Sequence, residues 1–282
     1  MPSRGDGQHS MNATIERLEI NAGNANLSYL KAGSGPVLLM MHGLMANAVD
    51  FKMQFEEFSS RRLCLAPDLP GFGMSREHGS EEPGLYVAAD AMEAFIRELV
   101  PEGEKLDLLG HSFGSVVALE LTSRIPEKLR SVTIVGAPTD MTAKPLQRAL
   151  MPFLPTFSIL VNKITIDFYS RNVNIDRRNL TPEIDSLLEE RNSIVSPEDA
   201  DSMMSYIKSF KDWVLPEYPS DYDIPTLIVH GAVDNVVSMN AAEKLASKIP
   251  NSTVKIIGNA RHSPMYEQSE EFNRILGEFL RI

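Results

Sequence analysis

Short apolar runs alternate along the chain with longer segments in which apolar residues recur every three or four positions. A continuous apolar run predicts a strand buried on both faces, whereas the three-or-four spacing predicts a helix with one buried face. Their alternation predicts a parallel sheet covered by helices on both faces. The buried strands are predicted at Pro36–Met41, Leu63–Ala66, Leu106–Leu109, Val132–Val135, Thr226–Val229 and Val254–Ile257.

Two further strands precede these, at Ile15–Ala22 and Asn26–Ala32, with polar residues between the apolar ones. Gly23-Asn24 joins them, which predicts a hairpin at the edge of the sheet. Proline follows three of the predicted helices and explains where they stop, because it lacks the N–H that a helix interior needs. The helices flanking the sheet are predicted at Leu85–Val100, Phe113–Ile125, Ser238–Ile249 and Met265–Leu280.

The interval between Ala137 and Thr226 contains no run that predicts a strand. Helical segments are predicted there instead, at Leu146–Phe153, Ile159–Tyr169, Pro182–Arg191 and Pro197–Phe210. Because structureless loops of such length are uncommon in compact domains, we predict a helical cap at residues 139–222. The core domain is then residues 14–138 and 223–282. Residues 1–13, which are polar and rich in glycine and serine, are expected to form a flexible extension.

Composition and charge narrow the class of protein. The formal net charge of −11 argues against nucleic acid or an anionic membrane as the main partner, since both require excess Lys and Arg. No apolar stretch approaches the roughly 18 residues of a membrane span, and residues 1–12 lack the apolar core of a secretory signal. The single cysteine, Cys64, lies in an apolar run and is expected to be a buried core residue in a reducing compartment. We therefore expect a cytoplasmic protein.

The segment Gly110-His111-Ser112-Phe113-Gly114 carries the strongest chemical signal. It follows a predicted strand and precedes a predicted helix, which is the context of a nucleophile held on a sharp strand-to-helix turn. Small residues on either side let the backbone turn without a side-chain collision. Ser112 is therefore the candidate nucleophile.

A serine hydroxyl needs a base to accept its proton, and an acid to orient that base. His262 lies just past the last predicted strand and before the last helix, where the base is expected. Asp234 follows the strand Thr226–Val229 and is the preferred acid. Asp140, after Val132–Val135, is the alternative acid, because some hydrolases take it from the preceding strand.

Acyl transfer also needs N–H donors for the negative charge that develops on the carbonyl oxygen. The residue after the nucleophile, Phe113, supplies one, and Leu44 in the loop His42-Gly43-Leu44-Met45 is the natural second donor. No metal-ligand spacing of cysteine and histidine and no glycine-rich phosphate loop occurs elsewhere, so we expect no metal and no cofactor.

Taken together, these segments resemble the α/β-hydrolase fold superfamily, nearest to its capped esterase and lipase branch. The resemblance covers about Ile15 to Ile282 and includes a further glycine-rich segment at residues 68–75, Asp-Leu-Pro-Gly-Phe-Gly-Met-Ser. It implies an α/β-hydrolase fold, with an eight-stranded, mostly parallel sheet flanked by helices and a helical cap after strand 6. It also implies a Ser-His-Asp mechanism, in which Ser112 forms an acyl-enzyme that water activated by His262 releases.

The resemblance also separates branches of the superfamily by residue. Dehalogenases and epoxide hydrolases use an aspartate nucleophile where this chain has Ser112, and proline iminopeptidases carry a His-Gly-Gly-Pro-Gly loop that is absent here. Carbon–carbon hydrolases usually have a Ser/Gly-rich oxyanion loop and a tryptophan after the catalytic histidine, where this chain has Ser263. A carboxylesterase-like activity is therefore preferred. Thioesterase, lactonase, carrier-protein ester hydrolase and C–C bond hydrolase activities remain alternatives, as does a non-catalytic ligand-binding receptor on the same fold.

Substrate preference is expected to come from the cap. The apolar segment Leu150–Val161 predicts a mainly apolar acyl pocket, although most of its side chains are expected to pack the cap onto the sheet. Basic residues outnumber acidic ones between Lys144 and Arg178, which allows an anionic or carrier-linked substrate, although solvated helix faces explain such charges more simply. The candidate pocket residues are His42, Met45, Phe153, Phe157, Trp213 and Met265.

Overall fold

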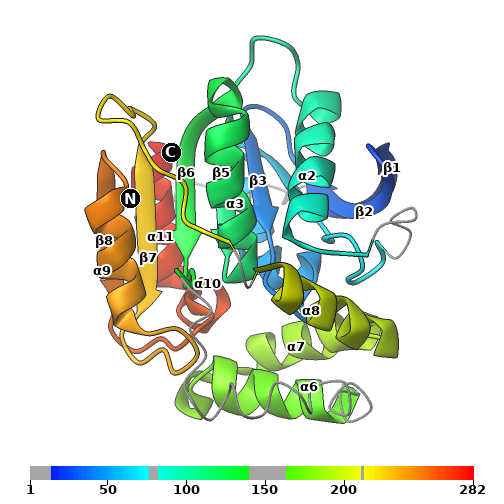
Figure 1. The fold of residues 1–282 in the computed structure, drawn as a ribbon. Coiled ribbons are helices and arrows are strands. Elements are labelled where there is room, and N and C mark those ends of the chain that lie inside the picture. The colour runs from blue at the N-terminus through cyan, green and yellow to red at the C-terminus, as the bar shows by residue number, and fades with distance from the viewer. Residues whose placement is uncertain (1–13, 76–81, 140–162, 211–212) are drawn as a thin grey trace, which may run out of the picture.

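The computed structural model describes residues 14–75, 82–139, 163–210 and 213–282. Its sheet has eight strands in the order β1-β2-β4-β3-β5-β6-β7-β8 (Figure 1). The strands are β1 Glu16–Ala22, β2 Ala25–Ala32, β3 Val37–Met41, β4 Leu63–Pro67, β5 Leu106–His111, β6 Leu129–Val135, β7 Thr226–Gly231 and β8 Ser252–Ile257. β1 and β2 pair antiparallel, as do β2 and β4, and every other neighbouring pair is parallel. The predicted mostly parallel sheet with an edge hairpin is thereby confirmed.

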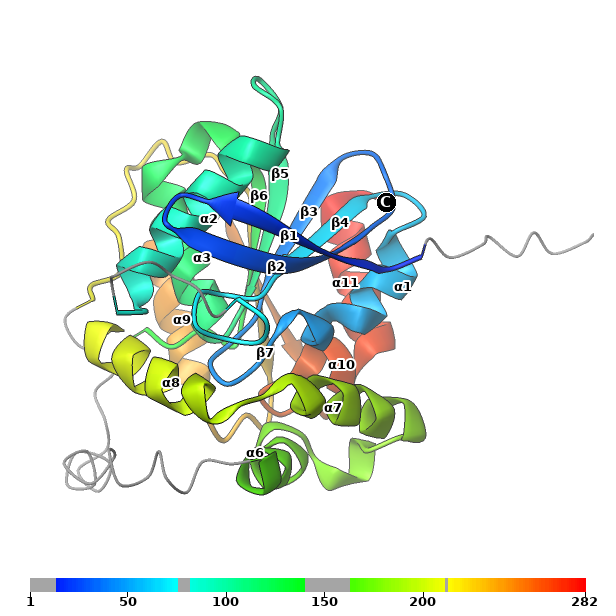
Figure 2. The same cartoon turned by 90° about the vertical axis from the view of Figure 1, so that its right-hand side faces the viewer.

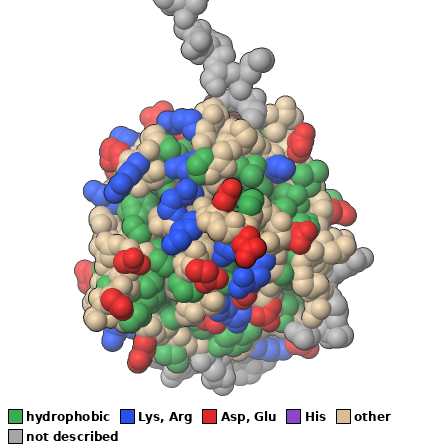
Figure 3. Space-filling model, turned by 90° about the horizontal axis from the view of Figure 1, so that it is seen from above, with side chains coloured by type: hydrophobic (Ala, Val, Ile, Leu, Met, Phe, Trp, Pro, Cys, Tyr) green, Lys and Arg blue, Asp and Glu red, His purple; other side chains and the backbone are tan. Residues whose placement is uncertain are grey.

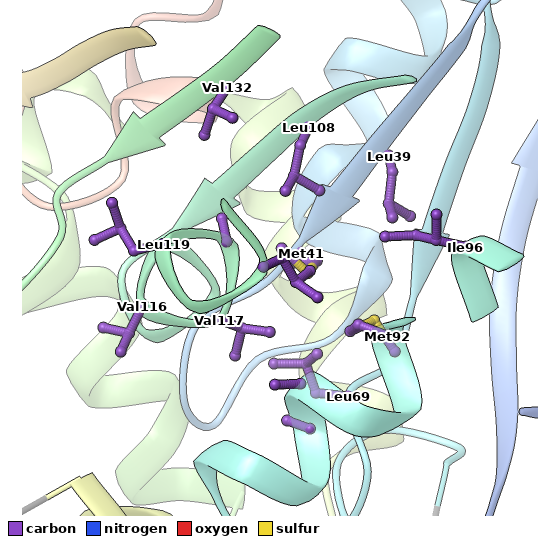
Figure 4. Close-up of a cluster of buried hydrophobic side chains, with 14 of the residues drawn as sticks. Leu39, Met41, Leu69, Met92, Ile96, Leu108, Val116, Val117, Leu119 and Val132 are labelled. Atoms are coloured by element: carbon purple, nitrogen blue, oxygen red, sulfur yellow. The ribbon is translucent and has the colours of Figure 1, made fainter. Parts of the chain in front are cut away.

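Side chains of one strand alternate between two hydrophobic cores. In β3, Leu39 and Met41 point into a core covered by α2 Leu85–Leu99, α3 Phe113–Arg124 and α9 Met239–Lys248. Figure 4 shows part of this cluster, which includes Leu108 of β5, Val132 of β6 and, from α3, Val116, Val117 and Leu119. The intervening Leu38 and Met40 enter the opposite core, which packs against α1 Lys52–Phe58 and α11 Ser269–Leu280. Burial on both faces explains why these strands are continuous apolar runs.

Two helical features differ from the sequence prediction. The prediction of one helix over Met265–Leu280 is wrong, because α10 Pro264–Glu267 and α11 are separated by Gln268, whose φ of −134° and ψ of 55° are not helical. Helix α1 was not predicted; it has only seven residues and follows the 3-10 turn η1 Ala48–Phe51 directly. A second 3-10 turn, η2 Pro126–Lys128, links α3 to β6.

The chain leaves the sheet after β6 and re-enters it at β7, the next strand in the sheet. Helices from this interval lie across the carboxyl ends of the strands (Figures 1 and 2). Its described elements are α6 Lys163–Tyr169, the π-helical turn η4 Ser170–Asn174, the 3-10 turn η5 Arg177–Asn179, α7 Pro182–Ile194 and α8 Pro197–Phe210. Leu187 of α7 and Phe210 of α8 join opposite cores of the sheet domain, which anchors the two helices. The predicted helix Leu146–Phe153 lies outside the described residues.

Within the described ranges, no helix is long and apolar enough to cross a membrane. At the end of the molecule opposite α6–α8, basic and acidic side chains are interspersed with apolar ones (Figure 3). That face therefore carries charge of both signs.

Candidate active site

Ser112 lies between the last residue of β5 and the first residue of α3, with φ of 52° and ψ of −117°. This left-handed backbone is strained for a residue other than glycine, and such strain is typical of functional sites. The neighbouring glycines make the turn sterically feasible. A Cβ on Gly110 would lie 2.4 Å from the carbonyl oxygen of Gly114, and a Cβ on Gly114 would lie 2.2 Å from that of Met41. The turn is fixed further by the Ser112 N–H, which donates to the Val135 carbonyl at 2.7 Å.

His262 lies between Ser112 and Asp234. Its Nε2 is 2.9 Å from Ser112 Oγ, and its Nδ1 is 2.8 Å from Asp234 Oδ2. Because a carboxylate only accepts hydrogen bonds, Nδ1 carries the proton of the neutral ring and Nε2 is left to accept from the Ser112 hydroxyl. The geometry is that of a serine whose proton can pass to an oriented imidazole.

The Asp234 side chain is buried and its second oxygen is also occupied, accepting the N–H groups of Val236 and Val237 at 2.8 and 2.9 Å. Burial acts to raise the pKa of Asp234, but the hydrogen bond and charge of His262, with these backbone donors, hold the pKa below its usual value. Asp234 therefore stays ionised and can stabilise a protonated His262. The alternative acid, Asp140, lies outside the described residues.

The loop that carries His262 is tied to the inserted segment. The N–H of His262 donates to the Asn174 carbonyl at 3.0 Å, and the Arg261 guanidinium donates to the carbonyls of Asn172 and Ile175 at 2.6 and 3.1 Å. Glu267 joins the same network through its carboxylate. Sequence reasoning missed these contacts because their partners are backbone groups about ninety residues apart in the chain.

The two predicted oxyanion donors lie in two backbone segments next to Ser112. Phe113 is the first residue of α3, so its N–H has no acceptor within that helix. Leu44 lies in the loop after β3, which approaches the nucleophile so closely that a Cβ on Gly43 would be 3.0 Å from Ser112 Cβ. Both N–H groups therefore belong to backbone that surrounds the serine.

His42, predicted to line the pocket, does not line it. Its side chain is buried beneath the Leu44 loop, where Nδ1 donates to the Gly43 carbonyl at 2.7 Å and Nε2 accepts from the Leu69 N–H at 2.8 Å. Burial lowers the pKa of His42, which keeps the ring neutral. These two hydrogen bonds connect the loop that carries Gly43 and Leu44 to Leu69.

A cavity of about 420 Å³ opens on Ser112 and His262. Its lining includes apolar residues from the core and from the inserted helices: Leu44, Met45, Ala46, Ile166, Met203 and Val236. Polar side chains form the remainder: Asp50, His111, Thr165, Tyr169, Ser170, Asn174 and Arg191. The cavity can therefore hold a small molecule with both apolar and polar parts.

Of the other predicted pocket residues that the structure describes, only Met45 lines the cavity. Trp213 is buried against Phe210, with ring centroids 5.2 Å apart, and its indole N–H donates to Glu120 at 3.3 Å. Met265 is fully buried in the core beneath α10. Both predictions are corrected by the same fact, that these side chains complete a core instead of facing the cavity. Phe153 and Phe157 lie outside the described residues.

Asp50 and Arg191 form a buried ion pair that the sequence did not reveal, with Nη1 of Arg191 3.4 Å from Oδ1 of Asp50. Burial raises the pKa of Asp50, and the positive charge of Arg191 opposes that rise. Arg191 also donates to Asn192 Oδ1 from Nε at 3.0 Å, and from Nη2 to Ser170 Oγ. The pair therefore links η1 of the core to α7 and η4 of the inserted segment.

The excess of basic residues predicted for this region is offset by local pairing. Arg171 bonds Asp167 at 2.8 Å and also pairs with Asp185, and Arg178 bonds Asp176 at 2.6 Å. Lys144 and Arg148 lie outside the described residues. Arg177 and Arg178 are both exposed.

Among the described residues, no group of three His, Cys, Asp or Glu side chains could hold a metal ion. Cys64 is buried, and burial raises the pKa of its thiol to about 12. A thiol with such a pKa stays protonated and is a poor nucleophile.

Both the sequence and the fold are similar to those of known hydrolases. A family model described as alpha/beta hydrolase fold matches residues 36–269. The chain is 25% identical to a 2-hydroxy-6-oxo-2,4-heptadienoate hydrolase of Pseudomonas putida, over 96% of this chain and 98% of the relative. It is 22% identical to a pimeloyl-[acyl-carrier protein] methyl ester esterase of Vibrio parahaemolyticus, over 88% and 96%. Its fold is similar to that of a thermophilic esterase from Thermogutta terrifontis, with a TM-score of 0.78 and 20% identity, over 94% of this chain and 98% of that one.

Proposed function

Because the chain belongs to the α/β-hydrolase fold family and is a hydrolase, we propose that it cleaves carboxylic esters through an acyl-enzyme on Ser112. The observation that carries the proposal is the position of His262, which lines a partly apolar cavity and lies within hydrogen-bonding distance of both Ser112 and Asp234. An ester with a short apolar or mixed acyl group suits such a cavity.

The reaction follows from these groups. Ser112 Oγ attacks the ester carbonyl while its proton passes to His262 Nε2, and Asp234 stabilises the resulting imidazolium. The N–H groups of Leu44 and Phe113 hold the negative charge on the carbonyl oxygen. The imidazolium then protonates the leaving alcohol, and the acyl group remains on Ser112. Water, deprotonated by His262, releases the acid and restores the serine.

The test is a panel of esters, thioesters and lactones of graded acyl length, compared by kcat/KM. We expect measurable hydrolysis of short esters, its loss in Ser112→Ala, and labelling of Ser112 by a fluorophosphonate, located by mass spectrometry. A protein that binds acyl ligands tightly but hydrolyses no ester and leaves the probe unreacted would contradict the proposal and favour a binding receptor.

Carbon–carbon bond hydrolysis is the second candidate, favoured by the likeness to a 2-hydroxy-6-oxo-2,4-heptadienoate hydrolase over nearly the whole chain. That compound, offered in the same panel, distinguishes the two: a kcat/KM well above that of every ester would reverse our preference.

Hydrolysis of a carrier-linked ester is the third candidate, suggested by the likeness to the acyl-carrier protein methyl ester esterase. In that case, replacing Arg177 and Arg178 with glutamate would raise KM for a carrier-bound ester and leave free esters unaffected.

We further propose that residues 139–222 act as a cap that roofs the cavity. The described part supports this, because Ile166, Ser170 and Met203 line the cavity together with Ser112.

A further inference from the structure

The polar part of the cavity contains one negative and one positive side chain. Asp50, from η1, and Arg191, from α7, both line the cavity, and both side chains are almost entirely buried, at 1% and 3% exposure. Their closest atoms are 3.4 Å apart. At this separation the two charges cancel for a group approaching from the cavity, which then meets a dipole instead of a net positive charge.

Arg191 is also committed to its own surroundings. Its Nε and Nη2 donate to Asn192 Oδ1 at 3.0 and 2.8 Å, and Nη2 donates again to Ser170. A ligand carboxylate would therefore give up its hydration for an arginine whose charge Asp50 already compensates, and whose donors are largely occupied. Burying a charge without a compensating partner is unfavourable.

We propose that the cavity favours esters whose acyl part ends in an uncharged polar group, such as a carboxamide, over those that end in a carboxylate, because Asp50 compensates the charge of Arg191. The inference rests on the ester hydrolysis proposed at Ser112. It makes Asp50 a residue that determines specificity and takes no part in the bond cleavage.

Matched pairs of methyl esters test this proposal: the monomethyl esters of succinate, glutarate and adipate, and the corresponding monoamides. Within each pair the shape is nearly the same and only the carboxylate and carboxamide differ. We expect the wild type to favour the carboxamide in kcat/KM by at least about tenfold for the chain length that fits. Equal kcat/KM for the carboxamide and the carboxylate at every chain length, measured with the wild type alone, would overturn the proposal.

Asp50→Asn should then move the ratio toward the carboxylate by at least about tenfold, because Arg191 is left with an uncompensated charge facing the cavity. The double variant Asp50→Asn, Arg191→Gln removes that charge and should lose the shift. Glu190→Gln is the matched control: it alters the net charge equally and lies next to Arg191 on α7, but Glu190 is half exposed, pairs with Lys52 and does not line the cavity. A ratio that moves as much in Glu190→Gln as in Asp50→Asn would contradict the assignment.

Binding to Ser112→Ala, measured by calorimetry with the same esters, separates this inference from the proposed function. If no ester is cleaved but the carboxamide ester binds at least about tenfold more tightly than the carboxylate ester, and Asp50→Asn reverses the order, the selectivity stands and ester hydrolysis fails. If esters are cleaved without selectivity, the proposed function stands and this inference fails.

Discussion

The Glu267 carboxylate accepts a hydrogen bond at 2.6 Å from the backbone N–H of Arg261, the residue before His262. Its other oxygen accepts from the Asp176 N–H at 2.6 Å and from Asn179 Nδ2 at 2.8 Å. One buried side chain thereby connects the inserted segment to the loop that carries the proposed base. The position of His262 depends on residues that never touch the substrate.

Glu267→Gln is expected to disturb this connection, because an amide has one acceptor oxygen where the carboxylate has two in use. We expect kcat to fall by about tenfold or more with a smaller change in KM, and the free energy of unfolding to fall by about 1–3 kcal/mol. Steady-state kinetics and urea unfolding provide the measurement. Glu271→Gln, an exposed position on α11, is the control and should change neither. Unaltered kcat in Glu267→Gln would show that His262 is held without it.

Replacing Ser112 and His262 together should lower kcat no more than replacing Ser112 alone. The two act as one unit, so either single alanine substitution is expected to lower kcat by about three orders of magnitude or more. The measurement is kcat for Ser112→Ala, His262→Ala and the double variant on the best ester. If the fold-decrease in kcat of the double variant equalled the product of the two single fold-decreases, the residues would act independently and the proposed mechanism would be contradicted.

Acid should destabilise the protein through His111. Burial lowers the pKa of His111 to about 3, so below the usual pKa near 6.5 the unfolded chain gains a proton that the folded chain does not. The stability due to the neutral ring is therefore lost as the pH falls from about 6.5 toward 3, by up to about 1.4 kcal/mol per pH unit.

His111→Gln removes this titration and retains an N–H donor near the position of Nε2. We expect its free energy of unfolding, measured by urea titration between pH 7 and pH 4, to decline less steeply than that of the wild type. Parallel curves for the two proteins would contradict the assigned pKa. Burial also lowers the pKa of His42 and His230, so some acid sensitivity should persist in the variant.

Gly114→Ala should be strongly destabilising. The added Cβ would lie 2.2 Å from the Met41 carbonyl oxygen and 2.6 Å from that of His42, so α3 or the loop carrying Leu44 must shift. We expect a loss of several kcal/mol in unfolding free energy, measured by thermal or urea unfolding, with loss of esterase activity. Gly258→Ala, where nothing lies within 4 Å of the new Cβ, should stay within about 0.5 kcal/mol of the wild type.

The sheet was predictable because the parallel strands are buried on both faces and must be apolar throughout. Leu106–Leu109 and Thr226–Val229 were found for this reason, and each observed strand extends the prediction only by the residues that lead into the site. The positions of Ser112, Asp234 and His262 could be inferred because each follows a strand of one parallel sheet. The carboxyl ends of parallel strands lie at the same edge of the sheet, so residues that follow them come close together even when long segments separate them in the sequence.

The cavity was less predictable. Met265 and Trp213 have the side chains of pocket residues, but residue type does not reveal whether an apolar group faces a cavity or a core. Asp50 and Arg191 are 141 positions apart and resemble surface charges in the sequence. Their burial depends on how α7 packs against η1, which no local pattern encodes.

The direct pairing of β6 with β7, exemplified by Val132 opposite Thr226, completes the sheet without a strand from the segment between them. A different insertion could be transplanted there, giving a chimaera with a new substrate range and unaltered reaction chemistry. The graft must still supply the contacts that hold the His262 loop: an acceptor for the His262 N–H, which Asn174 provides here, and partners for Arg261 and Glu267. It must also replace side chains that complete the cores, such as Leu187 and Phe210. Compatibility between donor and recipient should therefore be judged at these contacts before any pocket residue is compared.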